Sequence, residues 1–300
     1  MNNLSDNTRG ALLMAASMAA FTFNDTFMKA LLVDIPVAQA LCLRGALNVV
    51  MVFAVVTRFI GPVRWRLSGR DWSLVALRSL GEVGAAFCFL ISITLMPLAN
   101  AAAITQTLPL TITIASALLF REALGWRRLL AIAIGFGGVV LIVKPGTEGF
   151  NIGSLWALGA MLCVVVRDLA TKVMSDHAPT STVTLAAAAA VALAGAVAQI
   201  GTPWEPLDLR QVGLLFGSSG FVILGYVLSI VVMKVGEISF VSPFRYTGLI
   251  WALITGFLFF GEWPKMSSLV GAAIIAATGI YTVLREARLR REARMLATEK

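Results

Sequence analysis

Apolar runs of about twenty residues recur along the whole of this 300-residue chain. A helix needs roughly 20 apolar residues to cross a bilayer core about 30 Å thick. The chain is 58% hydrophobic and only 13% charged, about half the charged share of a soluble globular domain. A soluble core could not hide so many apolar residues, which excludes a soluble enzyme, a disordered chain and a coiled coil. The sequence predicts an all-α, polytopic membrane protein.

Ten such runs are predicted to be transmembrane helices, and the connections between them are too short for a soluble domain. They cover about 10–32, 37–58, 72–95, 98–119, 127–144, 152–173, 178–200, 210–233, 238–260 and 266–284. Sixteen Lys and Arg residues fall on the side of the N-terminus and three on the opposite side. Cytoplasmic loops are enriched in these residues. We therefore expect a bacterial-type inner (plasma) membrane protein with cytoplasmic N- and C-termini, and with Asp34 and Gly149 facing the periplasm.

The formal net charge of +8 is explained by this topology. It predicts contact with anionic lipids at the cytoplasmic face and requires no nucleic-acid partner. Cys42, Cys88 and Cys163 all fall inside apolar runs, so neither a disulfide framework nor a metal site is predicted. The single histidine, His177, is interpreted as a loop residue. No cofactor and no metal are predicted, and the oligomeric state is left open.

The two halves of the chain resemble each other. Six residues of the first half recur in the second at an offset of 143 or 140 residues. The pairs are Gly10 and Gly153, Asp25 and Asp168, Lys29 and Lys172, Pro36 and Pro179, Phe120 and Phe260, and Glu122 and Glu262. Each half holds five predicted spans, and the odd number inverts the second half relative to the first. The predicted units are a five-helix repeat over 1–146, an inverted repeat over 147–284 and a basic cytoplasmic tail over 285–300.

Three further features accompany the inverted repeat: MPLANAAAITQTLP at 96–109, FVSPFRYTGLIWA at 240–252, and an acidic residue (Glu122, Glu262) closing spans four and nine. Together with the repeat, which covers essentially the whole chain, they resemble the EamA-type carriers of the drug/metabolite transporter superfamily. The resemblance implies a secondary carrier of small metabolites whose cavity is lined mainly by spans three, four, eight and nine. It implies no particular cargo, because the family includes amino-acid exporters, riboflavin importers and carriers of nucleotide derivatives.

Charged residues inside the predicted spans are the main candidates for a transport site, because each costs about 2.5–3.5 kcal/mol at the bilayer centre. Arg78 and Glu82 lie four residues apart on one face of span three, at depths of about 10 and 16 Å. Two interpretations stay open. The residues form a structural pair, or Glu82 binds a cargo amine or a proton while Arg78 binds a carboxylate. Their repeat mates, Ser218 and Val222, are uncharged, which favours a role at the site.

Spans four, eight and nine supply further candidates for cargo binding. They are Asn100, Gln106, Thr107, Tyr226, Arg245 and Tyr246. The guanidinium of Arg245 follows Pro243 and is suited either to clamp a carboxylate or phosphate or to pair with Glu82. Asn100 and Thr107 belong to a small polar stripe on span four, which Pro109 is expected to kink. Many such residues only hold membrane helices together, but a stripe that leads through a kinked helix favours a role in transport.

Six other charges are interpreted as gate latches or structural ion pairs. They are Asp25, Lys29, Arg44, Arg167, Asp168 and Lys172. In Asp25–Lys29 and in Asp168–Lys172 the acid precedes the base by four residues, the spacing of a helical ion pair. Arg44 and Arg167 are expected either to form ion pairs with Asp25 and Asp168 or to line the cavity.

The predicted function is secondary transport, by alternating access, of a small polar or zwitterionic metabolite, either amino-acid-like or a vitamin such as riboflavin. The buried charges leave one positive charge over, which favours a small-molecule cargo with an anionic group. A membrane-embedded enzyme and a non-transporting receptor are the alternatives. The sequence contains no phosphate-binding loop and no HExxH or GxSxG motif, so we expect no enzymatic activity.

Overall fold

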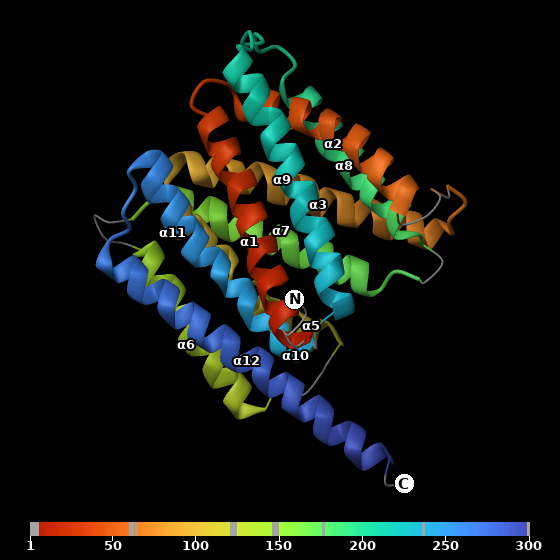
Figure 1. Cartoon of the computed structure of the whole chain (residues 1–300), viewed down its shortest axis with the longest axis vertical. Coiled ribbons are helices and arrows are strands. Elements are labelled where there is room, and N and C mark those ends of the chain that lie inside the picture. Colours follow the sequence, from red (N-terminus) through yellow and green to blue (C-terminus); the bar gives the residue numbers. More distant parts are fainter. Residues whose placement is uncertain are drawn as a thin grey trace, which may run out of the picture.

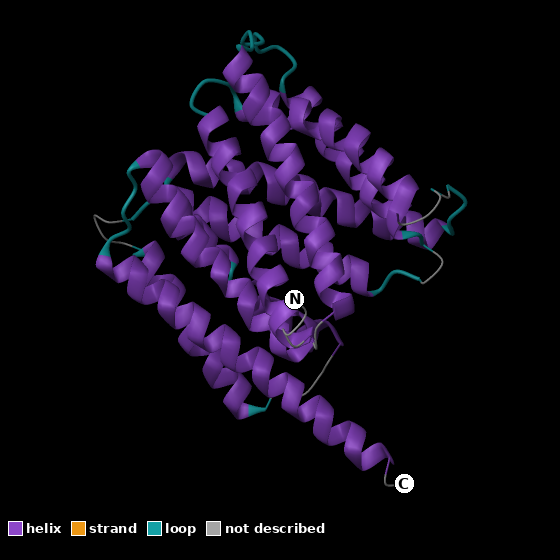
Figure 2. Cartoon of the chain, viewed as in Figure 1, coloured by secondary structure: helices purple, strands orange, loops and turns teal. Residues whose placement is uncertain are grey.

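A computed structural model describes residues 6–59, 63, 65–120, 125–145, 150–175, 178–235 and 238–298, which form helices joined by short connections (Figures 1 and 2). The helices are α1 (Asp6–Leu31), α2 (Val37–Phe59), α3 (Gly69–Leu95), α4 (Leu98–Thr105), α5 (Leu108–Phe120), α6 (Trp126–Val143), α7 (Gly153–Lys172), α8 (Thr180–Ala198), α9 (Leu209–Val235), α10 (Ile238–Val241), η1 (Ser242–Tyr246), α11 (Thr247–Phe260) and α12 (Met266–Thr298). The described part of the chain contains no strand. Glu122, Gly149 and His177 lie outside the described residues.

Nine helical segments in the described ranges are long and apolar enough to cross a membrane. The protein is therefore a multi-pass membrane protein, as the apolar runs predict. The remaining long helix, α1, packs along α9 but carries Asp6, Arg9, Asp25 and Lys29. A tenth span formed by α1 remains a prediction.

Two of the predicted spans are broken. The predicted span 98–119 consists of α4 and α5, with Gln106 and Thr107 in a turn between them. The predicted span 238–260 consists of α10, the short 3-10 helix η1 and α11. Pro109 does not mark the first break, because it lies in the first turn of α5, where a missing N–H is tolerated. The two broken spans are repeat mates, so each half contains one discontinuous span.

The last helix extends beyond its predicted span. Whereas the apolar run ends near residue 284, α12 continues to Thr298 and projects from the bundle in Figure 1. The basic segment predicted as a separate tail, 285–300, is a continuation of α12 in its described part.

The most extensive helix contacts join the two halves. In Figure 1 and in the contacts, α2 lies along α8 and α6 along α12, while α1 packs along α9 and α3 along α7. Since α7 and α9 are the repeat mates of α1 and α3, the last two contacts are the same contact with the halves exchanged. Each of the other two pairs a helix with its own mate. This arrangement fits a two-repeat architecture.

The backbones of α2 and α8 approach each other closely at two glycines. A Cβ atom on Gly195 would lie 2.4 Å from the backbone nitrogen of Cys42, and one on Gly45 would lie 2.6 Å from the Cα of Ala192. Small residues at membrane helix crossings allow this approach, and the van der Waals contact that results stabilises the pair. The crossing fixes one wall of the cavity described next.

Candidate functional site

A cavity of about 100 Å³ lies between α2, α3, α8 and α9. Its charged and polar lining residues are Arg44, Asn48, Arg78, Glu82, Thr184 and Tyr226, and small aliphatic side chains complete the walls. A volume of about 10–15 Å³ admits one water molecule, so this cavity holds several. Helices α3 and α9 are spans three and eight, two of the four spans that the family resemblance implies as cavity lining. Helices α2 and α8 line this cavity in place of spans four and nine.

Glu82 is the centre of the charge cluster at this cavity. Its Oε2 lies 3.5 Å from Nη1 of Arg167 on α7 and 3.8 Å from Nη1 of Arg78, one turn earlier on α3. Nε of Arg167 also donates to Oδ1 of Asp168 over 2.8 Å. The predicted Arg78–Glu82 pair is therefore present in the structure, and a third charge from the other half joins it. With Asp168 included, two carboxylates face two guanidinium groups, so the formal charges of this cluster balance.

Gly81 allows α7 to approach this cluster. A Cβ atom at this position would lie 2.8 Å from the backbone oxygen of Cys163 and 3.0 Å from the backbone nitrogen of Arg167. Because glycine has no Cβ, α7 packs directly on α3, and Arg167 reaches Glu82 on the next position of α3. The glycine thus helps to position an arginine that lies 85 residues after Glu82 in the chain.

Arg78 has hydrogen-bond donors that no described residue accepts. Its Nε and Nη1 atoms are buried without a hydrogen-bond partner, and Oδ1 of Asn48, across the cavity on α2, is likewise unpaired. A buried donor without an acceptor costs about 1–3 kcal/mol, and more when it is charged. An anionic or hydrogen-bonding ligand in the cavity would satisfy these groups.

Arg44 and Tyr226 extend the cluster on the side of α2 and α9. The Arg44 guanidinium interacts electrostatically with Asp25, Tyr226 and Glu82. The Tyr226 ring packs edge-on against Phe21 of α1, with 5.3 Å between the ring centroids. Asp25 accepts a 2.8 Å hydrogen bond from Nδ2 of its neighbour Asn24 and lies near Arg44, one of the alternatives left open from the sequence.

Two residues predicted to bind cargo are instead packed between helices. Thr107 is fully buried, and its hydroxyl donates to the carbonyl of Ile104 over 2.6 Å and contacts Sδ of Met161. Tyr246 is 6% exposed and lies against Gly279 of α12, where any Cβ atom would overlap the phenol. Neither residue lines the cavity.

Three other predicted residues lie near the broken spans and away from the cavity lining. Nε2 of Gln106 donates to the backbone carbonyl of Arg245 over 3.1 Å, which ties the α4–α5 break to η1. The Arg245 side chain is exposed, and Asn100 lies half-buried in α4. The structure brings Gln106 and Arg245 together, but it does not bring them to Glu82.

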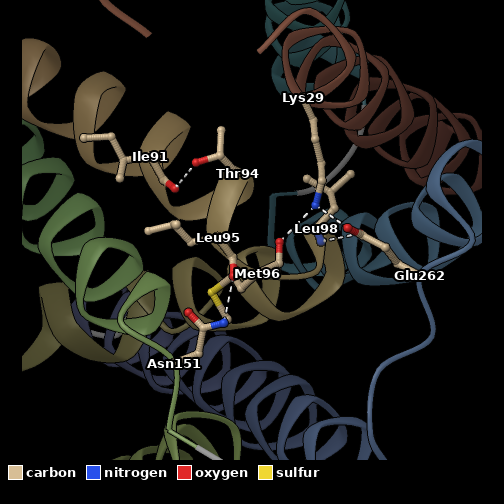
Figure 3. Close-up of polar contacts among 8 residues, drawn as sticks. All are labelled: Lys29, Ile91, Thr94, Leu95, Met96, Leu98, Asn151 and Glu262. Carbon is tan, nitrogen blue, oxygen red and sulfur yellow. Dashed lines mark hydrogen bonds and ion pairs between the residues drawn. The ribbon is translucent and has the colours of Figure 1, made fainter. Parts of the chain in front are cut away.

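The structure pairs Lys29 with a residue other than the predicted Asp25. Figure 3 shows Nζ of Lys29 between Glu262 and the backbone oxygen of Met96. The ammonium nitrogen lies 2.5 Å from Oε1 of Glu262 and 2.9 Å from that backbone oxygen. The predicted Asp25–Lys29 pair is thus replaced by a pair between the two halves, because Asp25 is held by Asn24 and Arg44. Lys172, the repeat mate of Lys29, lies exposed in the last turn of α7.

Asn48 and Thr184 line the cavity but were not predicted from the sequence. Asn48 lies one turn after Arg44 on α2, and that four-residue spacing could have revealed it. Thr184 lies one turn after Thr180 on α8, which is a polar spacing of the same kind. Glu262 was noted only as the acidic residue that closes span nine. Its duplication, shared with Lys29, was a signal that the two residues act together.

The described residues form an all-helical, multi-pass bundle with a charged cavity between its two halves, an arrangement typical of membrane transport proteins. The model of the EamA-like transporter family matches residues 8–144 and again residues 151–285. The chain belongs to the EamA-like transporter family.

Several relatives are similar in sequence, and a solved structure shares the fold. The chain is 28% identical to an S-adenosylmethionine uptake transporter of Rickettsia felis over 65% of its own length and 66%, just under two thirds, of that protein's length. It is 29% identical to a riboflavin transporter of Vibrio cholerae over 67% of this chain and 68% of that protein. It is 24% identical to a pseudopaline exporter of Pseudomonas aeruginosa over 89% and 94% of the two lengths. A protein of known crystal structure shares the fold, with a TM-score of 0.55 at 18% identity over 94% of this chain and 98% of the other.

Proposed function

We propose that this protein is a secondary carrier that moves a small polar metabolite bearing a carboxylate group through the cavity by alternating access. The observation that carries the proposal is Arg78, which lines the cavity and whose buried Nε and Nη1 atoms have no hydrogen-bond acceptor among the described residues. A guanidinium group binds a carboxylate through two parallel hydrogen bonds. Arg44 on the opposite wall adds a second positive charge.

Glu82 makes a zwitterionic cargo the best fit. Its carboxylate lies in the same lining as Arg78 and is suited to bind an ammonium group, while Arg78 holds the carboxylate of the same molecule. S-adenosylmethionine, the cargo in the names of several relatives, carries both groups on one carbon atom. Riboflavin carries neither. The cavity residues therefore favour an amino-acid-like cargo over a vitamin of that kind.

The size of the cavity indicates how cargo enters. Pockets that enclose a ligand measure about 300–1,000 Å³, whereas this cavity measures about 100 Å³. The helices around it, α2, α3, α8 and α9, must therefore separate before a metabolite can bind. Two helices from each half form the wall, so a movement of one half against the other opens it, as alternating access requires.

Reconstituted transport tests the proposal. Purified protein in proteoliposomes is expected to move zwitterionic amino-acid derivatives, among them S-adenosylmethionine, in uptake and counterflow assays. Riboflavin and neutral sugars are the comparison compounds. Transport of riboflavin without transport of any carboxylate-bearing compound would contradict the proposed cargo class.

Arg78→Lys separates the fork geometry from the charge. The ammonium of lysine keeps the positive charge but cannot make two parallel bonds, so transport at low cargo concentration should fall about tenfold or more. The apparent KM should rise while the folded yield stays near that of the native protein. Arg210→Lys is the matched control, because Arg210 is 64% exposed and pairs with Asp34 on the surface. A native KM in Arg78→Lys would mean that these donors do not hold cargo.

The orientation in the membrane is also a proposal, based on the sixteen-to-three distribution of Lys and Arg. Single cysteines at both termini of a cysteine-free variant should be protected from a membrane-impermeant thiol reagent in intact cells. A cysteine at Asp34 should be labelled. Labelling at both termini with protection at Asp34 would reverse the orientation.

A further inference from the structure

The ammonium group of Lys29 is enclosed by three groups from distant parts of the chain. Its Nζ donates to Oε1 of Glu262 over 2.5 Å and to the backbone oxygen of Met96 over 2.9 Å. It also lies 5.3 Å from the centroid of the Phe260 ring. Lys29 is 9% exposed, so these groups take the place of water around the charge (Figure 3).

The interruption between helices α3 and α4 supplies the backbone oxygen of this enclosure. Helix α3 ends at Leu95 and α4 begins at Leu98. The N-cap residue of α4 is Pro97, whose side chain makes no capping hydrogen bond. The backbone N–H of Leu98 donates to Oε2 of Glu262 over 3.0 Å. The cation therefore lies at the carboxyl end of α3 and the carboxylate at the amino end of α4, which matches the dipoles of both helices.

Asn151 provides a further hydrogen bond to the backbone at the α3–α4 break. Its Nδ2 donates to the backbone oxygen of Leu95 over 2.7 Å, as Figure 3 shows beside Met96. Backbone groups released by a broken helix must find partners inside a membrane. Here side chains of Lys29, Glu262 and Asn151 are those partners, and each comes from an element other than α3 and α4.

The members of this enclosure are the ligands that monovalent cations use at broken helices: a carboxylate, a backbone carbonyl and an aromatic face. We propose that Glu262, Met96 and Phe260 form a monovalent-cation site, which the tethered ammonium of Lys29 fills and which thereby fastens α1 to the α3–α4 break and to the end of α11. The native chain needs no free alkali ion at this site. When Lys29 withdraws, the three elements separate.

The internal repeat supports a shared role for the three side chains. Lys29, Phe260 and Glu262 each have the same residue type at the equivalent place in the other half, as the repeat in the sequence records. The lysine comes from the first half and the other two from the second. The duplicated lysine of the first half and the duplicated phenylalanine and glutamate of the second half thus meet in one site.

Chemical rescue tests the site without any cargo. Lys29→Ala removes Cγ, Cδ, Cε and Nζ, the heavy atoms of n-propylammonium. The Tm of this variant in detergent should be lower than that of the native protein. It should rise by several degrees, with saturation, as n-propylammonium is added. The native Tm should not respond, and neither should Lys29→Ala with 1-propanol, which has the same shape without the charge.

Two variants complete the design. Lys265→Ala removes an exposed lysine at the start of α12 and should show no response to n-propylammonium. The double variant Lys29→Ala with Glu262→Gln removes the counter-charge and should lose the rescue. A Lys29→Ala protein that folds but whose Tm is indifferent to n-propylammonium would overturn the cation site.

A double-mutant cycle keeps the proposal testable if Lys29→Ala does not fold. Lys29→Met and Glu262→Gln each leave one buried charge unpaired, whereas the double variant leaves none. We expect the double variant to be at least as stable as the weaker of the two single variants. Losses that simply add would show that the two groups do not act together. Both experiments measure folding alone, so their failure leaves the proposed cargo site unaffected.

Discussion

Replacing Glu82 with glutamine is expected to reduce transport per folded molecule by about ten- to a hundredfold, the factor that follows from losing one charge-assisted hydrogen bond worth about 1.5–3 kcal/mol. The substitution keeps the shape of the side chain and removes the only carboxylate that lines the described cavity. The ammonium of a zwitterionic cargo then has no counter-charge. The guanidinium group of Arg78, 3.8 Å from Glu82, would lose its counter-charge as well, and that of Arg167, 3.5 Å from Glu82, would keep only Asp168.

Folding of the Glu82→Gln protein is expected to survive, because Arg167 keeps its 2.8 Å contact with Asp168 and the amide oxygen of the new side chain still accepts hydrogen bonds from a guanidinium group. Transport should therefore be divided by the amount of monodisperse protein recovered from the membrane. Asp34→Asn makes the same change from acid to amide at a surface pair with Arg210 and should leave transport unchanged. Native transport in Glu82→Gln would assign Glu82 to structure alone.

Replacing Gly195 with alanine should lower the free energy of unfolding by about 1–3 kcal/mol, the usual cost of overpacking a close contact. The added Cβ would lie 2.4 Å from the backbone nitrogen and 2.9 Å from the Cα of Cys42. Both atoms belong to the backbone of α2, so no rotamer change relieves the overlap. The helices must move apart, and leucine at this position should prevent assembly altogether.

Thermal unfolding in detergent and the yield of monodisperse protein measure this effect. Gly137→Ala is the matched control, because Gly137 lies in α6 and a Cβ there would meet no atom within 4 Å. Alanine generally favours a helix over glycine, so the control should be neutral or slightly stabilising. Equal Tm values for the two variants would contradict the backbone contact between α2 and α8.

The positions of most helices could be predicted because a bilayer imposes its own thickness on any apolar run. The breaks could not. Pro109 was the visible signal in span four, yet the chain turns at Gln106 and Thr107, because a proline fits the first turn of a helix without disturbing it. The length of the last helix was also missed, since a helix that leaves the bilayer needs no apolar residues to continue.

The contacts of the candidate site also include some that the sequence predicts and some that it does not. Arg78 and Glu82 could be paired from the sequence, because four residues on a helix bring side chains to one face. Lys29 and Glu262 lie 233 residues apart, and their meeting depends on how α1, α3 and α11 pack. Asp25 has the right spacing for Lys29, but its side chain is held by Asn24. Spacing predicts which partners are within reach, and packing decides which of them is chosen.

The interlocking of α1 with α9, α3 with α7, α2 with α8 and α6 with α12 has a consequence for how the protein is made. Translation delivers the first half to the membrane before any of these partners exist. The helices of the first half therefore remain inserted but loosely associated until the ribosome has synthesised the second half. A polypeptide cut between the two halves would therefore yield two pieces whose helices each lack their principal neighbours.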